Sequence, residues 1–167
     1  MTRLTRDQYL ELRRQYEPTF IKLIIVAESP PASGRFFYNK AGSPNEPLFG
    51  AMMRHLGISP MTKETGLREF QKKGWILVDA TYEPVNKLTD KGRDEVIKRD
   101  YPLLFDDLTR LTPDRLVPVI LIKANVCRLL EHKLIQDGFE VLNHGIAIPF
   151  PASGRQTEFR EKFSALA

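Results

Sequence analysis

The sequence contains only one cysteine, Cys127, among its 167 residues. A single thiol excludes a disulfide framework, an iron–sulfur cluster and a zinc site built mainly on thiolates. The three histidines are spread along the chain, so the sequence predicts neither a bound metal nor a cofactor. This low cysteine usage favours an intracellular, cytoplasmic protein.

Long apolar runs and the standard nucleotide and hydrolase motifs are also missing. No apolar stretch approaches the ~20 residues of a membrane span, and residues 1–14 contain no apolar signal core, so we expect no membrane partner. The chain has no GxxxxGKS/T phosphate loop, no GxGxxG after a strand and no GxSxG turn. At this length the usual expectation is one domain, so residues 1–167 are predicted to form a single domain.

The charge balance is mildly basic. Lys and Arg number 25 and Asp and Glu number 21, which gives a net charge of +4, and the basic residues form no long block. Such a surface could bind a polyanion such as nucleic acid, or it could be an ordinary solvated surface of mixed charge.

Strand and helix patterns alternate along the chain. Short apolar runs predict four strands, at residues 21–27, 75–78, 117–122 and 139–142. Amphipathic patterns predict helices at residues 5–16, 48–56, 62–73, 125–136 and 156–165, with one or two more between 92 and 111. Strands separated by helices favour parallel pairing. We therefore predict an α/β protein, a three-layer α/β/α sandwich around a four-stranded, mainly parallel central sheet.

Three loops with unusual composition follow the predicted strands, at residues 27–39, 79–86 and 148–155. In folds of this class, ligands bind beyond the carboxyl ends of the strands. We therefore expect the functional site where these loops meet. His144, near the end of the last predicted strand, is a further candidate.

The first loop combines a carboxylate, two prolines and three aromatic residues. Glu28 could act as a general base or position a water, on a backbone that the prolines make rigid. Phe36, Phe37 and Tyr38 could stack on a planar ligand. In the alternative interpretation, Glu28 caps a turn and the aromatic residues cover the core.

The other two loops carry an acid and a possible phosphate site. Asp79 ends a buried strand, where an acid either faces the cleft or caps the next turn. Ser153 and Arg155 precede the last helix, whose N-terminus suits a phosphate group. The alternative for this loop is a Pro-rich lead-in to the helix.

Taken together, the loops resemble the uracil-DNA glycosylase superfamily. Residues 27–31, AESPP, look like its water-activating motif, which reads GQDPY, GINPG or GEAPG in different branches. Residues 34–56 are similar to the GxPFxGxAGxxLxxxL stretch of the thermophilic-type branch, and residues 120–124 to its LxGxxA segment. Residues 149–154, PFPASG, resemble the HPSPLS motif and the NPSG motif of the mismatch-specific branch. Asp79 stands where the family has a base-reading asparagine.

The resemblance implies the fold already predicted and a monofunctional, metal-free DNA glycosylase of base excision repair. Such an enzyme flips a damaged or deaminated base from single- or double-stranded DNA and hydrolyses its N-glycosidic bond. By position, Glu28 and Ser29 would be catalytic. Phe37 would stack on the base, with Phe36 or Tyr38 in its place if the register shifts by one. The remaining implied contacts are Asp79 with the base edge, and Arg35, Lys123, Ser153, Gly154 and Arg155 with the DNA backbone.

Four positions depart from the family pattern, and one of them is Phe150, which replaces the asparagine of the mismatch-specific branch. Ser29 replaces the aspartate or asparagine that handles the water, and Ile148 replaces the catalytic histidine, which leaves Glu28 as the best-placed carboxylate. Ionised Asp79 would only accept hydrogen bonds, whereas an asparagine both donates and accepts, as uracil requires. Asp79 is therefore protonated, or it reads a base edge rich in N–H donors, such as that of cytosine, adenine or guanine, or it reads no base.

These departures leave two alternative functions open. One is a nucleic-acid or nucleobase binding protein of the same fold without glycosylase activity, which the missing histidine and Ser29 favour. The other is a hydrolase of free nucleosides or nucleotides. Base release from DNA, binding without release, and turnover of free nucleosides distinguish the three.

Overall fold

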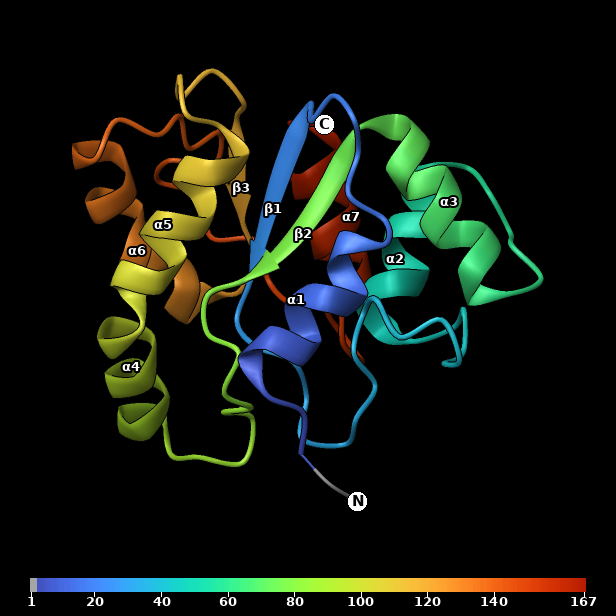
Figure 1. Ribbon diagram of the computed structural model, residues 1–167, viewed down its shortest axis with the longest axis horizontal. Coiled ribbons are helices and arrows are strands. Elements are labelled where there is room, and N and C mark those ends of the chain that lie inside the picture. Colours follow the sequence, from blue (N-terminus) through green and yellow to red (C-terminus); the bar gives the residue numbers. More distant parts are fainter. Residues whose placement is uncertain (1–2) are drawn as a thin grey trace.

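Three parallel strands form the central sheet of the protein. The structure is a computed structural model that describes residues 3–167, and Figure 1 shows helices on both sides of the sheet. The strands are β1 (Leu23–Ala27), β2 (Trp75–Asp79) and β3 (Val119–Leu121), and they pair in the order β2-β1-β3. The mixed α/β class and the parallel pairing predicted from the sequence are confirmed.

The predicted fourth strand, residues 139–142, is wrong in extent. In this segment only Val141 forms a bridge, with Val119 of β3. One step further, the side chain of Asn143 takes the place of the backbone: its Oδ1 accepts from the Leu121 N–H at 2.9 Å, and its Nδ2 donates to the Leu121 carbonyl at 2.8 Å. The side-chain amide thus ends the ladder, and within residues 3–167 the sheet has three strands instead of four.

Helices precede, connect and follow the strands of the described chain. They are α1 (Arg6–Arg14), α2 (Pro47–His55), α3 (Lys63–Lys73), α4 (Asp90–Arg99), α5 (Tyr101–Leu111), α6 (Ala124–Gln136) and α7 (Gln156–Ser164). Local signals explain their ends: Thr5 and Gln8 form a capping box on α1, and Thr62 caps α3, which ends at Gly74 in the left-handed conformation. Pro102 lies in the first turn of α5, which separates it from α4, so the 92–111 region holds two helices.

Side chains alternate between two cores on opposite faces of the sheet. In β2, Leu77 belongs to the core shared with α1, α2, α3 and α7, whereas Val78 belongs to the core shared with α4, α5 and α6. Figure 1 shows these two groups of helices on opposite sides of the sheet. This period of two places Asp79 on the same face as Leu77. The last residue of β2 therefore carries its carboxyl group toward the aromatic core. No helix within residues 3–167 has the length and apolar character needed to cross a membrane.

Two tyrosine hydroxyls cover the outer edge of β2. Its free edge would otherwise expose unpaired N–H groups. The Leu77 N–H donates to the Tyr38 hydroxyl at 2.9 Å, and the Asp79 N–H donates to the Tyr82 hydroxyl at 3.3 Å. Both hydroxyls are therefore structural partners of the strand that ends in Asp79.

Candidate functional site

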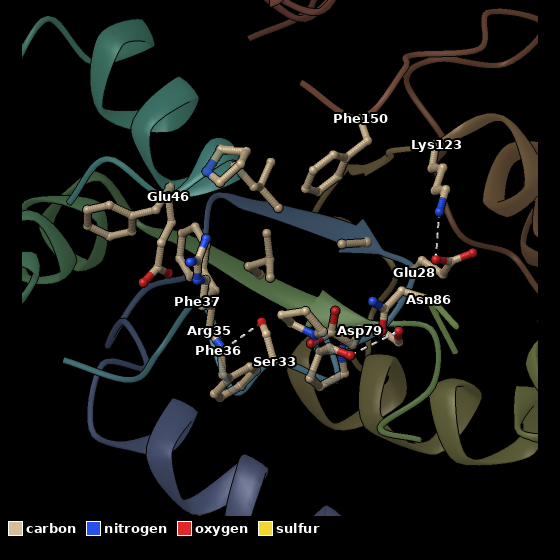
Figure 2. A pocket seen from close by; sticks show the side chains of 18 residues that line it. Glu28, Ser33, Arg35, Phe36, Phe37, Glu46, Asp79, Asn86, Lys123 and Phe150 are labelled. Atoms are coloured by element: carbon tan, nitrogen blue, oxygen red, sulfur yellow. Dashed lines mark hydrogen bonds and ion pairs between the residues drawn. The ribbon is translucent and has the colours of Figure 1, made fainter. Parts of the chain in front are cut away.

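A cavity of about 330 Å³ opens at the carboxyl ends of β1 and β2 (Figure 2). Its apolar wall comprises Pro30, Pro31, Phe36, Phe37, Leu48, Phe49, Leu77 and Phe150, and its polar groups come from Glu28, Ser29, Ser33, Arg35, Glu46, Asp79, Asn86 and Lys123. The parallel register pairs Ala27 with Asp79, so the residues that follow the two strands meet at one edge. A mostly apolar cavity with a few polar groups is the usual form of a small-molecule site.

Glu28 lies at the mouth of this cavity with both carboxylate oxygens engaged. Its Oε1 accepts from Lys123 Nζ at 2.7 Å, and its Oε2 accepts from Asn125 Nδ2 at 2.5 Å. Both partners lie at the start of α6, which begins directly after β3 and so returns to the same sheet edge. Each carboxylate oxygen retains a second lone pair, so Glu28 can still accept a hydrogen bond from a water or a ligand.

Asn125 was not predicted as a site residue. The signal was present in the sequence, because polar residues in the first turn after a buried parallel strand face the ligand edge. The second loop also contributes a residue that we did not predict: Asn86 lines the cavity, and its Oδ1 accepts from the Ala32 N–H at 2.9 Å. That contact ties the second loop to the first.

Lys123 reaches Glu28 from a strained backbone. Its φ of 88° and ψ of 138° lie in a region that residues with a side chain rarely adopt, and such a conformation costs about 1–3 kcal/mol. The Lys123 N–H donates to the Ile148 carbonyl at 2.7 Å, which fixes the third loop beside β3. The sequence predicted a phosphate contact for this lysine, but within the described chain its ammonium group is paired with Glu28.

Asp79 forms a buried polar spot in the cavity. Its exposed fraction is 5%, and no group within residues 3–167 donates a hydrogen bond to its carboxyl oxygens. The interpretation that it caps the next turn is therefore wrong. Asp79 instead offers an unpaired carboxyl group to whatever enters the cavity.

Burial raises the pKa of Asp79 to about 8. The Arg13 guanidinium opposes this rise, whereas the nearby carboxylates of Glu28 and Asp107 add to it. At neutral pH the group is therefore mostly a neutral carboxylic acid, with one O–H donor and one carbonyl acceptor. Of the three alternatives that the sequence left open for Asp79, the protonated form agrees with this pKa.

A buried network lies behind Asp79. Arg13 donates to both oxygens of Asp107, at 2.8 and 2.7 Å, and to the Tyr82 hydroxyl at 2.9 Å. Tyr82 in turn accepts from the Asp79 N–H. The sequence analysis missed Arg13, although it lies four residues after Tyr9 in α1, on the buried face of that helix.

The three aromatic residues of the first loop have different environments. Phe36 and Phe37 line the cavity, whereas Tyr38 is 1% exposed, is absent from the cavity lining and hydrogen-bonds to β2. Phe37 is held edge-on against Phe49 and other aromatic rings. Phe150 of the third loop points toward the same cavity (Figure 2). All three residues belong to the core, and Phe36 and Phe37 also form part of the cavity wall, so stacking by Phe37 stays a prediction.

A second buried ion pair anchors this aromatic loop. Lys63 of α3 donates to Glu46 at 2.6 Å and to the Phe36 carbonyl at 2.7 Å, with its side chain fully buried. Burial lowers the pKa of Lys63, and the bond to Glu46 opposes that shift. Because Glu46 and Phe36 both line the cavity, the pair holds its wall to α3.

The third loop contributes less to the cavity than the sequence suggested. Ser153, Gly154 and Arg155 are exposed and absent from its lining, and Arg155 pairs at 3.4 Å with Glu158 in the first turn of α7. His144 is likewise exposed and outside the lining.

Ser29 and Arg35 both line the cavity. The Ser29 hydroxyl donates to the Pro30 carbonyl at 3.1 Å and accepts from the Val85 N–H at 3.2 Å, so it supports the loop. Arg35 is exposed at the rim and has no ion pair with a residue of the described chain. Of the predicted site residues, the cavity thus brings together Glu28, Ser29, Arg35, Phe37, Asp79 and Lys123.

Within residues 3–167, no group of three or more His, Cys, Asp or Glu side chains is arranged to hold a metal ion. The sequence matches no protein-family model, and no curated protein matches it significantly.

Proposed function

We propose that the protein is a DNA glycosylase with a uracil-DNA glycosylase-like fold, which hydrolyses the N-glycosidic bond of a damaged or deaminated base flipped from DNA. The observation that carries the proposal is the unpaired, buried Asp79 carboxyl in an aromatic cavity whose mouth holds Glu28. A flipped base needs an apolar pocket in which it can stack and a polar group that hydrogen-bonds to its edge. Phe37 and Phe150 would form the stacking walls, and Asp79 would be the polar group.

A neutral Asp79 can pair with the edge of a deaminated base. Deamination replaces an amino group beside an unprotonated ring nitrogen with a carbonyl beside an N–H. A neutral carboxyl group complements that carbonyl and N–H pair with its own donor and acceptor. When the glycosidic bond breaks, its electron pair goes to the base, and the Asp79 O–H can stabilise the resulting negative charge on the base oxygen.

Glu28 is the group that would act on the water. Its free lone pairs can accept a hydrogen bond from a water that attacks C1′ of the sugar, and the carboxylate takes the proton as the bond forms. The bonds from Lys123 and Asn125 fix its orientation in advance. Arg35 at the rim would contact the DNA backbone, where a free guanidinium suits a phosphate.

One observation favours the alternative, a nucleobase or nucleic-acid binding protein that does not cleave. Both oxygens of Glu28 are already hydrogen-bonded to the protein, and the Ser29 hydroxyl is also engaged. A binding protein would need the cavity and Asp79, but it would not need a carboxylate that is free to act as a general base.

The deciding experiment is a panel of single- and double-stranded oligonucleotides that each carry one modified base, including uracil and hypoxanthine. Alkaline cleavage reports base release, and fluorescence anisotropy reports binding. We expect release by the wild type, loss of release in Glu28→Gln, and no change in the matched control Asp106→Asn, whose side chain is exposed. Binding without release by the wild type would support the alternative, and turnover of free nucleosides alone would indicate a nucleoside hydrolase.

A further inference from the structure

Lys123 is placed at the site at three physical costs. Its backbone is strained, with φ at 88°; within residues 3–167 the other positive-φ positions are Arg115, with φ at 64°, and glycines such as Gly74. Its side chain is only 30% exposed. Lys123 is also the residue that precedes α6, and the positive end of the helix dipole repels an ammonium group. Asn125 also donates to the Glu28 carboxylate, on its other oxygen, so Glu28 is not held by Lys123 alone.

The amino group lines the same cavity as the proposed water-activating carboxylate. Figure 2 shows Lys123 extending toward Glu28, and the two groups are 2.7 Å apart. If Glu28 directs a water to C1′, then Lys123 Nζ is within reach of the same carbon. A lysine becomes an amine nucleophile when a neighbouring base takes its proton, and Glu28 is the base within reach of Lys123.

We propose that Lys123 is a second nucleophile of this site, which forms an imine with the C1′ aldehyde of an abasic sugar and cleaves the DNA strand on its 3′ side. This inference rests on the proposed function, because base excision produces the abasic sugar that it consumes. It adds a lyase step to an enzyme that the sequence predicted to be monofunctional.

The step balances without an oxidant, a metal or a cofactor. Glu28 accepts a proton from the Lys123 ammonium, and the free amine adds to C1′ of the open-chain aldehyde to form an N–C bond. Glu28 returns this proton to the former carbonyl oxygen, which leaves as water, so that the protonated imine forms and Glu28 is a carboxylate again. Loss of a C2′ proton to Glu28 then expels the 3′ phosphate with the electrons of its C–O bond. Water finally hydrolyses the imine and restores the amine.

The test uses an oligonucleotide that already contains an abasic aldehyde, so it does not depend on base excision. Wild-type protein is incubated with this DNA and sodium borohydride, which reduces an imine to a stable amine. We expect a covalent protein–DNA adduct, with the modified peptide containing Lys123 by mass spectrometry. A tetrahydrofuran analogue, which has no aldehyde, should give no adduct.

Two substitutions separate the nucleophile from a structural role. Lys123→Arg keeps a cation beside Glu28 but has no nucleophilic amine, and Lys123→Gly relieves the backbone strain, so both should fold and both should lose the adduct. Lys40→Arg is the matched control, because Lys40 is exposed and absent from the cavity lining, and it should keep the adduct. Undiminished trapping by Lys123→Gly would overturn the inference. Base release without trapping would overturn the inference and leave the proposed function intact. Trapping without base release would support the inference and contradict the proposed function.

Discussion

Replacing Asp79 with asparagine should remove the pH dependence of this site while keeping the size and hydrogen-bonding groups of the side chain. The amide has nearly the same size as the carboxyl group and also carries one acceptor and donors. Because the pKa of Asp79 is about 8, the wild-type side chain presents a similar pair only while it is protonated. The variant should therefore resemble the wild type at neutral pH and differ from it in alkaline solution.

The size of the effect on base reading follows from that pKa. With a pKa of about 8, roughly 90% of Asp79 is neutral at pH 7 and roughly 3% at pH 9.5. Base release or base binding by the wild type should fall about 30-fold over this interval if only the neutral form reads the base. In Asp79→Asn the same interval should produce no such fall, because the amide does not titrate.

Asp79 also affects the free energy of unfolding, and its pH dependence is opposite in sign to that of a salt-bridged acid, whose pKa is lowered on folding. Its pKa is raised from 3.8 to about 8 on folding, so the native state holds a proton that the unfolded chain releases. Stability is lost as the pH rises from about 3.8 through about 8, at about 1.4 kcal/mol per unit. At pH 7 this amounts to about 4 kcal/mol, so Asp79→Asn should be more stable than the wild type by about that free energy.

The assay pairs single-turnover base release from pH 6 to 9.5 with urea unfolding over the same range, for the wild type, Asp79→Asn and Asp106→Asn. Asp106 is exposed, so its variant should follow the wild type in both measurements. Coincident pH profiles for the wild type and Asp79→Asn, together with equal free energies of unfolding at pH 7, would refute the assignment of a neutral, unpaired Asp79.

Three further predictions concern neighbouring groups. Glu28→Gln should slow base release by roughly 10²–10⁴ and leave DNA affinity unchanged, as gel-shift titrations would show; unaltered turnover would remove Glu28 from the reaction. Arg35→Gln should flatten the log–log salt dependence of DNA binding by roughly one unit, and an unchanged slope would mean that Arg35 does not touch a phosphate. Arg13→Met should cost about 3–5 kcal/mol of unfolding free energy, because it leaves Asp107 buried without its partner. A loss under about 1 kcal/mol, which is typical of an exposed ion pair, would show that the network is dispensable.

Short-range signals made much of the fold predictable. Caps such as Thr5 and Thr62, and a left-handed glycine such as Gly74, act within one turn of the chain, so the helix ends could be found without tertiary information. The alternation of strands and helices predicted parallel strands whose carboxyl ends meet at one edge of the sheet. That prediction was sufficient to place Glu28 and Asp79 in one cavity.

The errors arose where a side chain competes with the backbone or where distant residues meet. The run at residues 139–142 has the composition of a strand, but nothing local shows that Asn143 will bond to Leu121 and end the pairing. Arg13 and Asp107 are 94 residues apart, so their pairing is invisible in either segment alone. Such contacts depend on packing, which a pattern read along one sequence does not contain.

The bonds around Glu28 also determine when the protein becomes competent during its synthesis. Its partners Lys123 and Asn125 come 95 and 97 residues later in the chain. The entropy of closing loops of that length must be lost before the contacts can stabilise the fold. A nascent chain that ends before Lys123 has a carboxylate at β1 with nothing to orient it. Glu28 is therefore oriented only after β3 and the start of α6 have been synthesised and have docked, and the cavity wall is complete only when Phe150 follows.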